Sequence, residues 1–419
     1  MPKLTLGPAI IALAVSIACA EEAEELERIV VTPSRMVTEL GSSSRSIRYL
    51  DGKDIEYSVY RDVPDTLAEI GGIDVRRRGP EGVQSDISIR GTTFEQNASL
   101  LDGVRSSDPQ TGHFNTDWPV TMMDVERVEI VKGPSSSVYG PNAFGGVVNV
   151  VTKRPEGEGL LVYGEGGSFD YAAFGCSNTV SVGPFSNRFS IEERRATGYM
   201  PESQFDIFTL TDTALFRMPS GDLGFLFGYM YKDFGAADFY SNLYPNEDER
   251  TDTRFFRLNG DFDFGAIAFN PDLYLRRHRD KFSLDANRPG WQTNYHTTYN
   301  YGGDLDFALE NTIIDAAFGY ELYRDTVDST NLQTHSRTVD GLYLEVAPHL
   351  AKGLQFNAAV RWDYYGDFGW ECSPTVSAGW KALEWLTARG VVGRAYRIPT
   401  FTDLYYNDAA NRGNSSLRP

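Results

Sequence analysis

The sequence contains few cysteines, and beyond its first twenty residues it has no long apolar run. Only Cys176 and Cys372 lie beyond that first stretch, far apart and without metal-ligand or redox spacing. An oxidising compartment would allow a disulfide between them, but nothing in the sequence predicts one. No later segment reaches the roughly eighteen consecutive apolar residues of a spanning helix. Hydropathy alone would describe a secreted, soluble chain. That conclusion does not hold for membrane-spanning β-strands, because their polar lumen-facing residues offset their apolar residues in an average hydropathy.

Basic residues are also in short supply. There are 39 Lys and Arg against 58 Asp and Glu, which gives a formal net charge of −19 at pH 7. An acidic surface argues against a nucleic-acid partner. The 5 histidines share no metal-binding spacing, and the sequence has no nucleophile-elbow, zinc-ligand or phosphate-loop motif. The sequence therefore predicts no enzyme, no metal site and no cofactor.

The N-terminus has the parts of a secretory signal peptide. A positive charge at Lys3 precedes an apolar run over residues 6–18, and the small residues Ala18, Cys19 and Ala20 follow. We therefore expect a signal peptide over residues 1–20, cleaved after Ala20. A spanning helix would need a longer run, and lipidation of Cys19 would favour an aliphatic residue where Ser16 stands.

Residues up to about 155 have the mixed pattern of a small α+β domain. A helix is expected over residues 62–70, because acidic residues stand near its start and Gly71-Gly72 ends it. Strands are expected at residues 73–76, 86–90, 98–101, 125–132 and 146–152.

From about residue 160 the sequence becomes a succession of long strands separated by turns. In residues 354–364 the apolar side chains fall on one face, and Gln355, Asn357, Arg361 and Asp363 fall on the other. Residues 256–264 and 314–323 repeat this alternation. A soluble β-sandwich also alternates, but its strands usually end near five or six residues. Strands of roughly ten residues, with one charged face and aromatic ends, favour a transmembrane antiparallel β-barrel.

The connections between these strands alternate between short and long, as in a barrel with one periplasmic and one external rim. Longer polar loops are expected at residues 195–206, 232–251, 279–293, 323–336 and 363–372. About thirteen strands can be counted, whereas bacterial single-chain barrels have an even number. An open sheet would leave unpaired edges in lipid. We therefore expect the chain to lack C-terminal strands.

A series of short motifs runs through residues 87–150. The residues that carry it are Arg90, Gly91, Asp102, Gly103, Glu129, Gly133, Pro134, Tyr139, Gly140, Gly145, Gly146 and Asn149. In order and spacing these motifs resemble the plug domain of TonB-dependent outer-membrane receptors. Residues 394–406 and 413–419 resemble a segment from the middle of the barrel in that family, so the resemblance extends to the last residue.

A segment near the mature N-terminus looks like the TonB box of this family. It consists of Ile29, Val30, Val31, Thr32 and Pro33. An apolar β-branched run near a free terminus can leave the barrel and add a strand to a partner's sheet edge. The alternative is an ordinary first strand of the plug.

The resemblance implies the fold and its division. A full-length member is a transmembrane antiparallel β-barrel of twenty-two strands, of which about thirteen are expected here, with an N-terminal α+β plug domain filling the lumen. We expect a signal peptide over residues 1–20, an N-terminal segment with the TonB box over 21–36, a plug domain over 37–155 and a partial barrel over 156–419.

The resemblance also implies a function. We expect a receptor of the bacterial outer membrane that binds a scarce nutrient, an iron chelate or cobalamin, at the plug apex and imports it to the periplasm with TonB-transmitted energy. The implied partners are the TonB C-terminal domain with its inner-membrane energising complex, outer-membrane lipid and a small-molecule chelate or vitamin, and we expect a monomer. The alternative is a non-transporting surface binding or adhesion protein on the same barrel. The box and the complete plug argue against it.

By motif position, the loops at the plug apex are residues 76–85, 92–97 and 106–118. Their candidate substrate-binding residues are Arg77, Arg78, Gln84, Phe94, Asn97, Asp108, Gln110, His113, Asn115 and Trp118. Such groups suit a polar chelate. The arginines at 76–78 would attract an anionic chelate or form a solvated turn. The acidic run at 246–252 could hold a hard cation such as calcium or form a solvated loop.

The plug motifs also have expected physical roles. The motif glycines would supply positive φ or a close backbone approach in tight turns. Arg90, Asp102, Glu126, Arg127 and Glu129 would form ion pairs inside the plug or against the barrel wall. A role confined to folding the plug is the alternative for each of them.

Overall fold

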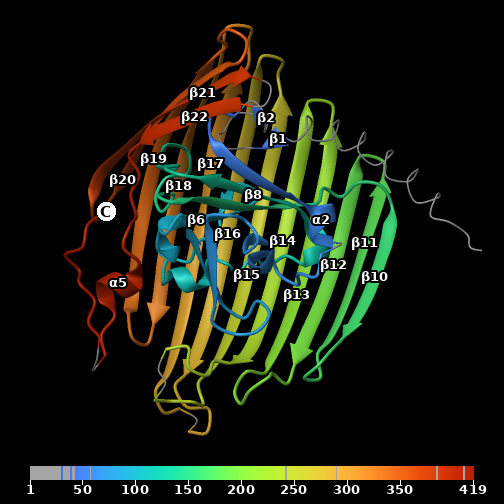
Figure 1. The fold of residues 1–419 in the computed structure, drawn as a ribbon, viewed down its shortest axis with the longest axis vertical. Coiled ribbons are helices and arrows are strands. Elements are labelled where there is room, and N and C mark those ends of the chain that lie inside the picture. Colours follow the sequence, from blue (N-terminus) through green and yellow to red (C-terminus); the bar gives the residue numbers. More distant parts are fainter. Residues whose placement is uncertain are drawn as a thin grey trace, which may run out of the picture.

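The structure, a computed structural model, describes residues 30–31, 38–39, 43–56, 58–240, 243–288, 290–383, 386–408 and 411–419. The expected signal peptide, and Ile29, Thr32 and Pro33 of the expected TonB box, lie outside these ranges. Two units follow one another along the chain, a small mixed unit and a large antiparallel sheet (Figure 1). No helix among the described residues is both long and apolar enough to span a membrane.

The first unit, residues 43–152, is called the plug. Its five-stranded sheet has the order β3-β8-β9-β6-β7, with only β6 and β9 parallel. The strands are β3 (Ser46–Asp51), β6 (Asn97–Leu101), β7 (Val104–Arg105), β8 (Val125–Lys132) and β9 (Gly146–Thr152). Around them lie the hairpin β4 (Ile73–Arg77) and β5 (Ser85–Ile89) and the short helices α2 (Gly52–Glu56), α3 (Val63–Leu67), α4 (Ser136–Tyr139), η3 (Phe94–Gln96), η4 (Gly112–Phe114) and η5 (Met122–Asp124).

Local sequence accounts for most of the plug elements. Asp62 caps α3 by accepting a hydrogen bond from the backbone N–H of Asp65 at 2.8 Å, and Pro64 stands in the first turn. The helix is shorter than expected, but all five expected strands are confirmed within one residue at each end. The sequence did not predict β3, which lies at a sheet edge and has no buried side chain.

The second unit is a 13-stranded antiparallel sheet in sequential order, which confirms the expected number of strands. Its strands are β10 (Gly159–Gly166), β11 (Ala172–Val182), β12 (Phe185–Ala196), β13 (Phe205–Met218), β14 (Gly221–Gly235), β15 (Asp248–Asp263), β16 (Ile267–Ser283), β17 (Thr293–Leu309), β18 (Ile314–Ser329), β19 (Gln333–Pro348), β20 (Leu354–Tyr365), β21 (Gly369–Leu383) and β22 (Leu386–Gly393). Within the described residues β10 and β22 each pair on one side only, so the sheet is an open barrel wall.

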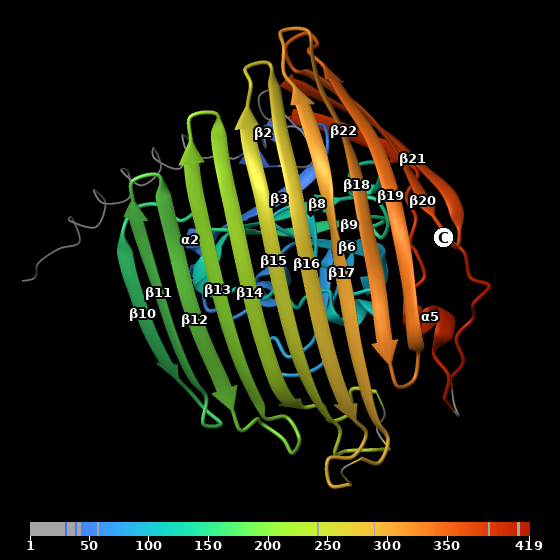
Figure 2. The same cartoon turned by 180° about the vertical axis from the view of Figure 1, so that it is seen from behind.

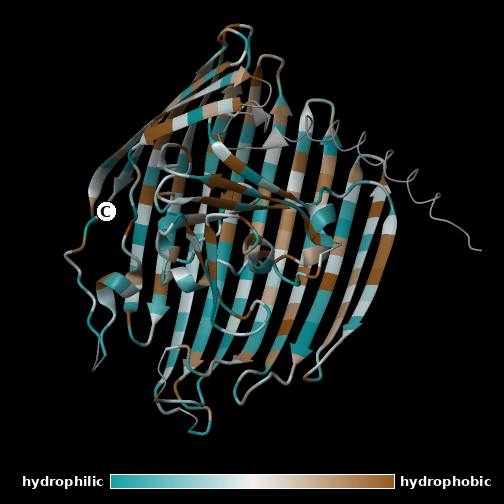
Figure 3. Ribbon diagram, in the orientation of Figure 1, coloured by the Kyte–Doolittle hydropathy of each residue, from teal (hydrophilic) through white to brown (hydrophobic). Residues whose placement is uncertain are grey.

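Hydrophobic and hydrophilic residues alternate along the strands of the wall (Figure 3), and the exposed positions are mainly apolar whereas the buried ones are mainly polar. In β20, for example, Leu354, Trp362 and Tyr364 are 40–45% exposed, whereas Arg361 and Asp363 are fully buried on the other face. This confirms the alternation read from residues 354–364. A large exposed apolar surface suits lipid rather than water.

The plug lies against the inner face of the curved wall, in front of the sheet in Figure 1 and behind it in Figure 2. Three connections of the wall are long, residues 197–204, 236–247 and 284–292, and all three lie at the same end of the strands. We call their end of the strands the long-loop rim and the opposite end the short-turn rim. After β22 the chain returns towards the plug and forms α5 (Phe401–Tyr405) near the long-loop rim (Figure 1).

Two of the expected long loops are wrong. Residues 330–332 alone join β18 to β19, and residues 366–368 alone join β20 to β21, in place of loops at 323–336 and 363–372. These strands continue beyond the apolar band, so their outward positions, such as Arg324 and Asp328, are polar as well. Polarity therefore does not distinguish the end of a long strand from a loop.

Candidate substrate site at the plug apex

Three segments of the plug, residues 78–84, η3 and η4, lie towards the long-loop rim. Arg78 donates a hydrogen bond to the carbonyl oxygen of Phe239 at 2.7 Å, and Gln84 Nε2 donates to the hydroxyl of Tyr240 at 3.1 Å. Phe239 and Tyr240 belong to the long connection between β14 and β15. These contacts identify the end of the plug that meets the long loops, and we call it the plug apex.

Charged and aromatic side chains gather at the plug apex in one group, the apex cluster: Arg78, Asp86, Phe94, His113 and Tyr240. His113 Nδ1 lies 2.7 Å from Asp86 Oδ1, and its ring stacks on Phe94 at 4.4 Å between centroids. Arg78 Nε donates to Asp86 Oδ2 at 3.2 Å, and its guanidinium lies 5.6 Å from the ring centre of Tyr240. The cluster thus combines a cation, hydrogen-bonding groups and aromatic faces.

The electrostatics of the cluster favour an ionised carboxylate and a protonated phenol. Burial alone would raise the pKa of Asp86, but the hydrogen bond and charge of His113, together with Arg78, lower the pKa below its ordinary value. Burial raises the pKa of Tyr240 well above its ordinary value. The Tyr240 hydroxyl therefore remains a hydrogen-bond donor at neutral pH.

The segment containing α5 lies across the same apex. Its backbone N–H groups at Phe401 and Thr402 donate to the carbonyl oxygens of Pro109 at 3.0 Å and Gln110 at 3.1 Å. Arg397 pairs with Glu95 of η3 and, at 2.7 Å, with Asp403. Burial and the charge of Asp403 raise the pKa of Glu95 despite Arg397. The segment is therefore fastened to the plug by main-chain and charged contacts.

Buried ion pairs fix the plug to the barrel wall. Asp108 pairs with Arg276 at 2.6 Å, with side chains 0% and 1% exposed, and also accepts a hydrogen bond from Thr298 at 2.9 Å. Asp117 pairs with Lys232 at 2.7 Å in a similarly buried position. Burial would raise the pKa of Asp108, but the charge of Arg276 contributes to lowering it. Such pairs order an interface more than they stabilise it.

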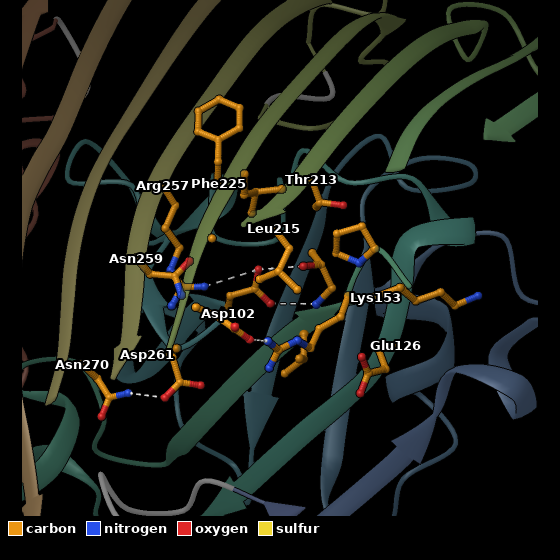
Figure 4. A pocket seen from close by; sticks show the side chains of 18 of the residues that line it. Asp102, Glu126, Lys153, Thr213, Leu215, Phe225, Arg257, Asn259, Asp261 and Asn270 are labelled. Carbon is orange, nitrogen blue, oxygen red and sulfur yellow. Dashed lines mark hydrogen bonds and ion pairs between the residues drawn. The ribbon is translucent and has the colours of Figure 1, made fainter. Parts of the chain in front are cut away.

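A cavity of about 490 Å³ lies between plug and wall towards the short-turn rim (Figure 4). The plug motif residues Asp102, Gly103, Tyr139 and Asn149 contribute to its lining. The carboxylate of Asp102 accepts hydrogen bonds from the backbone N–H of Thr152 at 2.7 Å and its hydroxyl at 2.8 Å, and Arg257 of the wall lies 3.7 Å away. The plug motifs thus border a polar space beneath the apex.

Comparison with known proteins identifies the two units. Residues 39–147 match the family model "TonB-dependent Receptor Plug Domain", and residues 197–419 match "TonB dependent receptor-like, beta-barrel". The chain belongs to the TonB-dependent receptor family. Members of this family are β-barrel proteins of the outer membrane that act as receptors and transporters rather than enzymes.

The relatives of this receptor are longer than the chain. The vitamin B12 transporter BtuB of Vibrio cholerae serotype O1 is 24% identical over 96% of this chain and 67% of its own length. The siderophore receptor PirA from Acinetobacter baumannii superposes with a TM-score of 0.73 at 15% identity, over 93% of this chain and 68% of PirA. A mutant of the ferric enterobactin receptor PfeA from Pseudomonas aeruginosa gives 0.72 at 18% identity, over 90% and 65%. The receptor therefore spans about two thirds of their length.

The receptor structure brings four of the ten candidate substrate residues together at the apex, namely Arg78, Gln84, Phe94 and His113. Arg77 lies apart from them, because its guanidinium pairs with Asp65 at 2.6 Å.

The other five candidates are buried in the plug or against the wall. Asn97 Nδ2 donates to the carbonyl oxygen of Ile87, Asn115 Oδ1 accepts from the backbone N–H of Asp108, and Trp118 packs in the core. Asp108 faces Arg276, and Gln110 is 6% exposed beneath the α5 segment. Their contacts fit a role in ordering the apex loops.

Sequence reasoning missed the partners that complete the apex of the receptor. Asp86 lies in a strand run, where it reads as an ordinary polar position, yet it joins Arg78 to His113. Tyr240 and Arg397 come from segments more than a hundred residues away in the sequence. The only signal available for Arg397 was that its segment resembles one in the family.

The plug motifs have the backbone conformations expected of them. Five of the six motif glycines have positive φ, including Gly140 at +71° directly after α4. A Cβ on Gly145 would lie 2.5 Å from Asn97 Oδ1, so that position requires a close approach. Arg127 pairs with Glu126 at 2.6 Å and Glu129 at 2.7 Å, whereas no ion pair between described residues involves Arg90.

Of the expected TonB box, only Val30 and Val31 are described. They form the two-residue strand β1 (Val30–Val31), which pairs antiparallel with β2 (Thr38–Glu39). A box that can move to a partner's sheet and an ordinary first strand of the plug would both form such a strand pair, so the pairing does not distinguish them. The box therefore stays a prediction.

The remaining candidates concern cations and thiols. Within the described ranges, no group of three or more His, Cys, Asp and Glu side chains is placed to hold a metal ion. The acidic run at 246–252 therefore gains no support as a calcium site. Cys176 and Cys372 lie on β11 and β21 as free cysteines.

Proposed function

We propose that this receptor binds an iron chelate or cobalamin at the plug apex and imports it to the periplasm with energy transmitted by TonB. The observation that carries the proposal is the apex cluster, where Arg78, Phe94, His113 and Tyr240 converge beneath the long loops. Cationic, aromatic and hydrogen-bonding groups held in one place suit a polar chelate with delocalised charge.

The similar proteins support this class of substrate. Their names describe a vitamin B12 transporter, siderophore receptors and a ferric citrate transporter. We propose that the ligand of this receptor is likewise a polar molecule that carries a metal. We propose Arg78, Gln84, Phe94 and His113 as substrate contacts of this receptor, with Tyr240 and Arg397 added from the barrel.

Energised release follows from the way in which the plug is held. Charged pairs such as Asp108–Arg276 and Asp117–Lys232 fix the plug on the inner face of the wall, where it obstructs passive flow. Import therefore requires work on the plug, which we assign to TonB acting on Ile29 to Pro33. We further propose that residues 1–20 direct secretion, that residues 21–36 form the energising segment and that the mature receptor lies in the outer membrane as a monomer.

Deletion of Ile29 to Pro33 tests this mechanism in cells. We expect uptake of the bound chelate to stop while equilibrium binding at the cell surface stays unchanged, because the box contacts the energiser and not the substrate. A substitution of Arg324, an exposed side chain on the outer face of the wall, by Gln serves as the control. Continued uptake by the deletion variant would show that TonB does not act through this segment, and a loss of binding would show that the segment orders the apex.

A further inference from the structure

The outer face of the wall carries a group of basic side chains close to the long-loop rim. They occupy outward positions near the start of β15 and the end of β16, and we call them the outer basic cluster: Arg250, Arg254, Arg277, Arg279 and Lys281. The intervening residues, such as Thr251 and Asp280, are 2% and 5% exposed on the inner face. Strand alternation therefore directs the cluster outwards.

The pairing of β15 with β16 places like charges directly opposite one another. Arg250 faces Lys281 and Arg254 faces Arg277, whereas Asp252 between them faces Arg279. Like charges in directly opposite positions destabilise a sheet. The cluster therefore concentrates positive charge on one part of a chain whose formal net charge is −19.

The carboxylates nearby compensate this charge only in part. Asp233 pairs with Arg250 at 2.8 Å, and Asp252 pairs with Arg254 at 3.2 Å and lies 3.8 Å from Arg277. In the part of the chain that the structure describes, no ion pair involves Arg279 or Lys281. The cluster therefore retains cationic groups that are suited to an anion.

A cleft of about 330 Å³ opens among these side chains. Arg250, Arg279 and Lys281 line it together with a single outward carboxylate, Asp252. Tyr231 and Tyr295 line it on the adjoining strands β14 and β17, and Tyr295 is 54% exposed. Tyrosines of this kind mark the interface between lipid and water in membrane barrels.

The depth of the cleft in the wall is also informative. The next outward positions below the cluster are apolar, with Phe256 40% and Leu258 49% exposed on β15. One outward position on the same face corresponds to roughly 7 Å along the strand. The cluster thus begins where the hydrocarbon band ends, at the depth of lipid headgroups.

We propose that this cleft binds the phosphate groups of a phosphorylated lipid headgroup in the outer leaflet. Arg279 can offer a bidentate fork and Lys281 a point charge to phosphate oxygens, and the tyrosines can pack beside the sugar or glycerol portion. The inference rests on the proposed outer-membrane location but not on transport, because the cleft opens on the opposite face of the wall from the plug apex.

The test is a titration of the purified receptor in detergent with a phosphorylated glucosamine lipid and its dephosphorylated form, with bound lipid counted by native mass spectrometry. The variant R279Q/K281Q should bind the phosphorylated lipid at least about tenfold more weakly, since each basic residue near anionic lipid contributes to attraction. The charge-retaining variant R279K/K281R should bind more tightly than R279Q/K281Q, because both positions keep a cation, although position 279 loses the bidentate fork. The matched control R324Q/K352Q removes two exposed charges outside the cleft and should have no effect.

Several results would overturn the proposal. Equal binding by R279Q/K281Q and wild type would show that the cleft is not the site. Equal loss with R324Q/K352Q would show attraction by overall charge alone. Equal affinity for the dephosphorylated lipid, or full displacement by millimolar inorganic phosphate, would exclude a lipid phosphate as the specific ligand. Chelate binding measured on the same samples keeps this outcome separate from that of the proposed function.

Discussion

At the scale of single residues, buried charges of opposite sign join the plug to the wall. Arg276 and Asp108 lie 2.6 Å apart with almost no exposed surface. Removing charges from water costs several kcal/mol per ion, and pairing recovers that cost only when both partners are present. Each buried partner therefore depends strongly on the other.

The variant Arg276→Met should destabilise plug docking by about 3–5 kcal/mol, because it leaves the carboxylate of Asp108 buried without its cation. Hydrogen exchange of the plug amides in urea measures the loss. The double variant R276M/D108N should recover most of it, since the unpaired charge is then removed. A single variant that loses less than about 1 kcal/mol would indicate that water already reaches Asp108.

The apex cluster should weaken in acid. His113 and Arg78 outweigh burial and lower the pKa of Asp86, so its ionised form is favoured in the folded receptor. A carboxyl with a lowered folded-state pKa contributes stability that is complete above its unfolded pKa, about 3.9, and is lost as the pH falls through the folded value. Chelate affinity and amide protection around residues 78–94 should therefore fall below about pH 4.

The matched variant Asp86→Asn should lack this acid transition and bind more weakly at neutral pH, because Arg78 and His113 lose their common anionic partner. Binding isotherms collected at several pH values give both results. The same acid transition in D86N and wild type would assign it to another group.

The candidate site shows how far residue-level reasoning extends. Motif position identified Arg78, Gln84, Phe94 and His113, which the structure brings to the apex. It could not separate them from Asn97 or Trp118, because burial depends on how the loops fold back onto the plug sheet. Motif position could not identify Tyr240 and Arg397, because no local pattern links them to plug segments so distant in sequence.

At the scale of elements, the period of two along each strand was the strongest signal. It predicted the wall strands because lipid on one side and the lumen on the other impose opposite polarity on alternate positions. The signal disappears beyond the apolar band, where both faces of β18 and β19 are polar. For that reason the number of strands was predicted correctly and two loop lengths were not.

The α5 segment provides the element-level prediction. Arg397→Ala should release residues 394–408 from the apex, because it removes the ion pairs to Glu95 and Asp403. Limited proteolysis should then cleave this segment roughly tenfold faster, in keeping with loss of about 1–2 kcal/mol of local stability. The control Arg394→Ala breaks a pair with Glu371 of the wall, at 2.5 Å, and should leave the apex contacts intact. Equal cleavage of both variants would contradict a specific role for Arg397.

At the scale of the whole molecule, the proposed function assigns recognition and release to different parts of the receptor. The apex cluster faces the long loops, the buried ion pairs hold the plug at mid-height, and a polar cavity lies towards the short-turn rim (Figure 4). A ligand at the proposed apex site would therefore have the plug between itself and the short-turn rim. Under the proposed function, recognition needs only the apex, whereas passage requires the plug contacts to rearrange.

The most direct test of this account is equilibrium binding of cobalamin, several ferric siderophores and haem to the wild-type receptor and two variants. For the chelate that binds, we expect R78A/H113A to reduce affinity at least about tenfold, equivalent to roughly 1.4 kcal/mol. The control D261N changes the cavity near the short-turn rim and should bind as the wild type does. Unchanged affinity in R78A/H113A, or a comparable loss in D261N, would contradict binding at the plug apex.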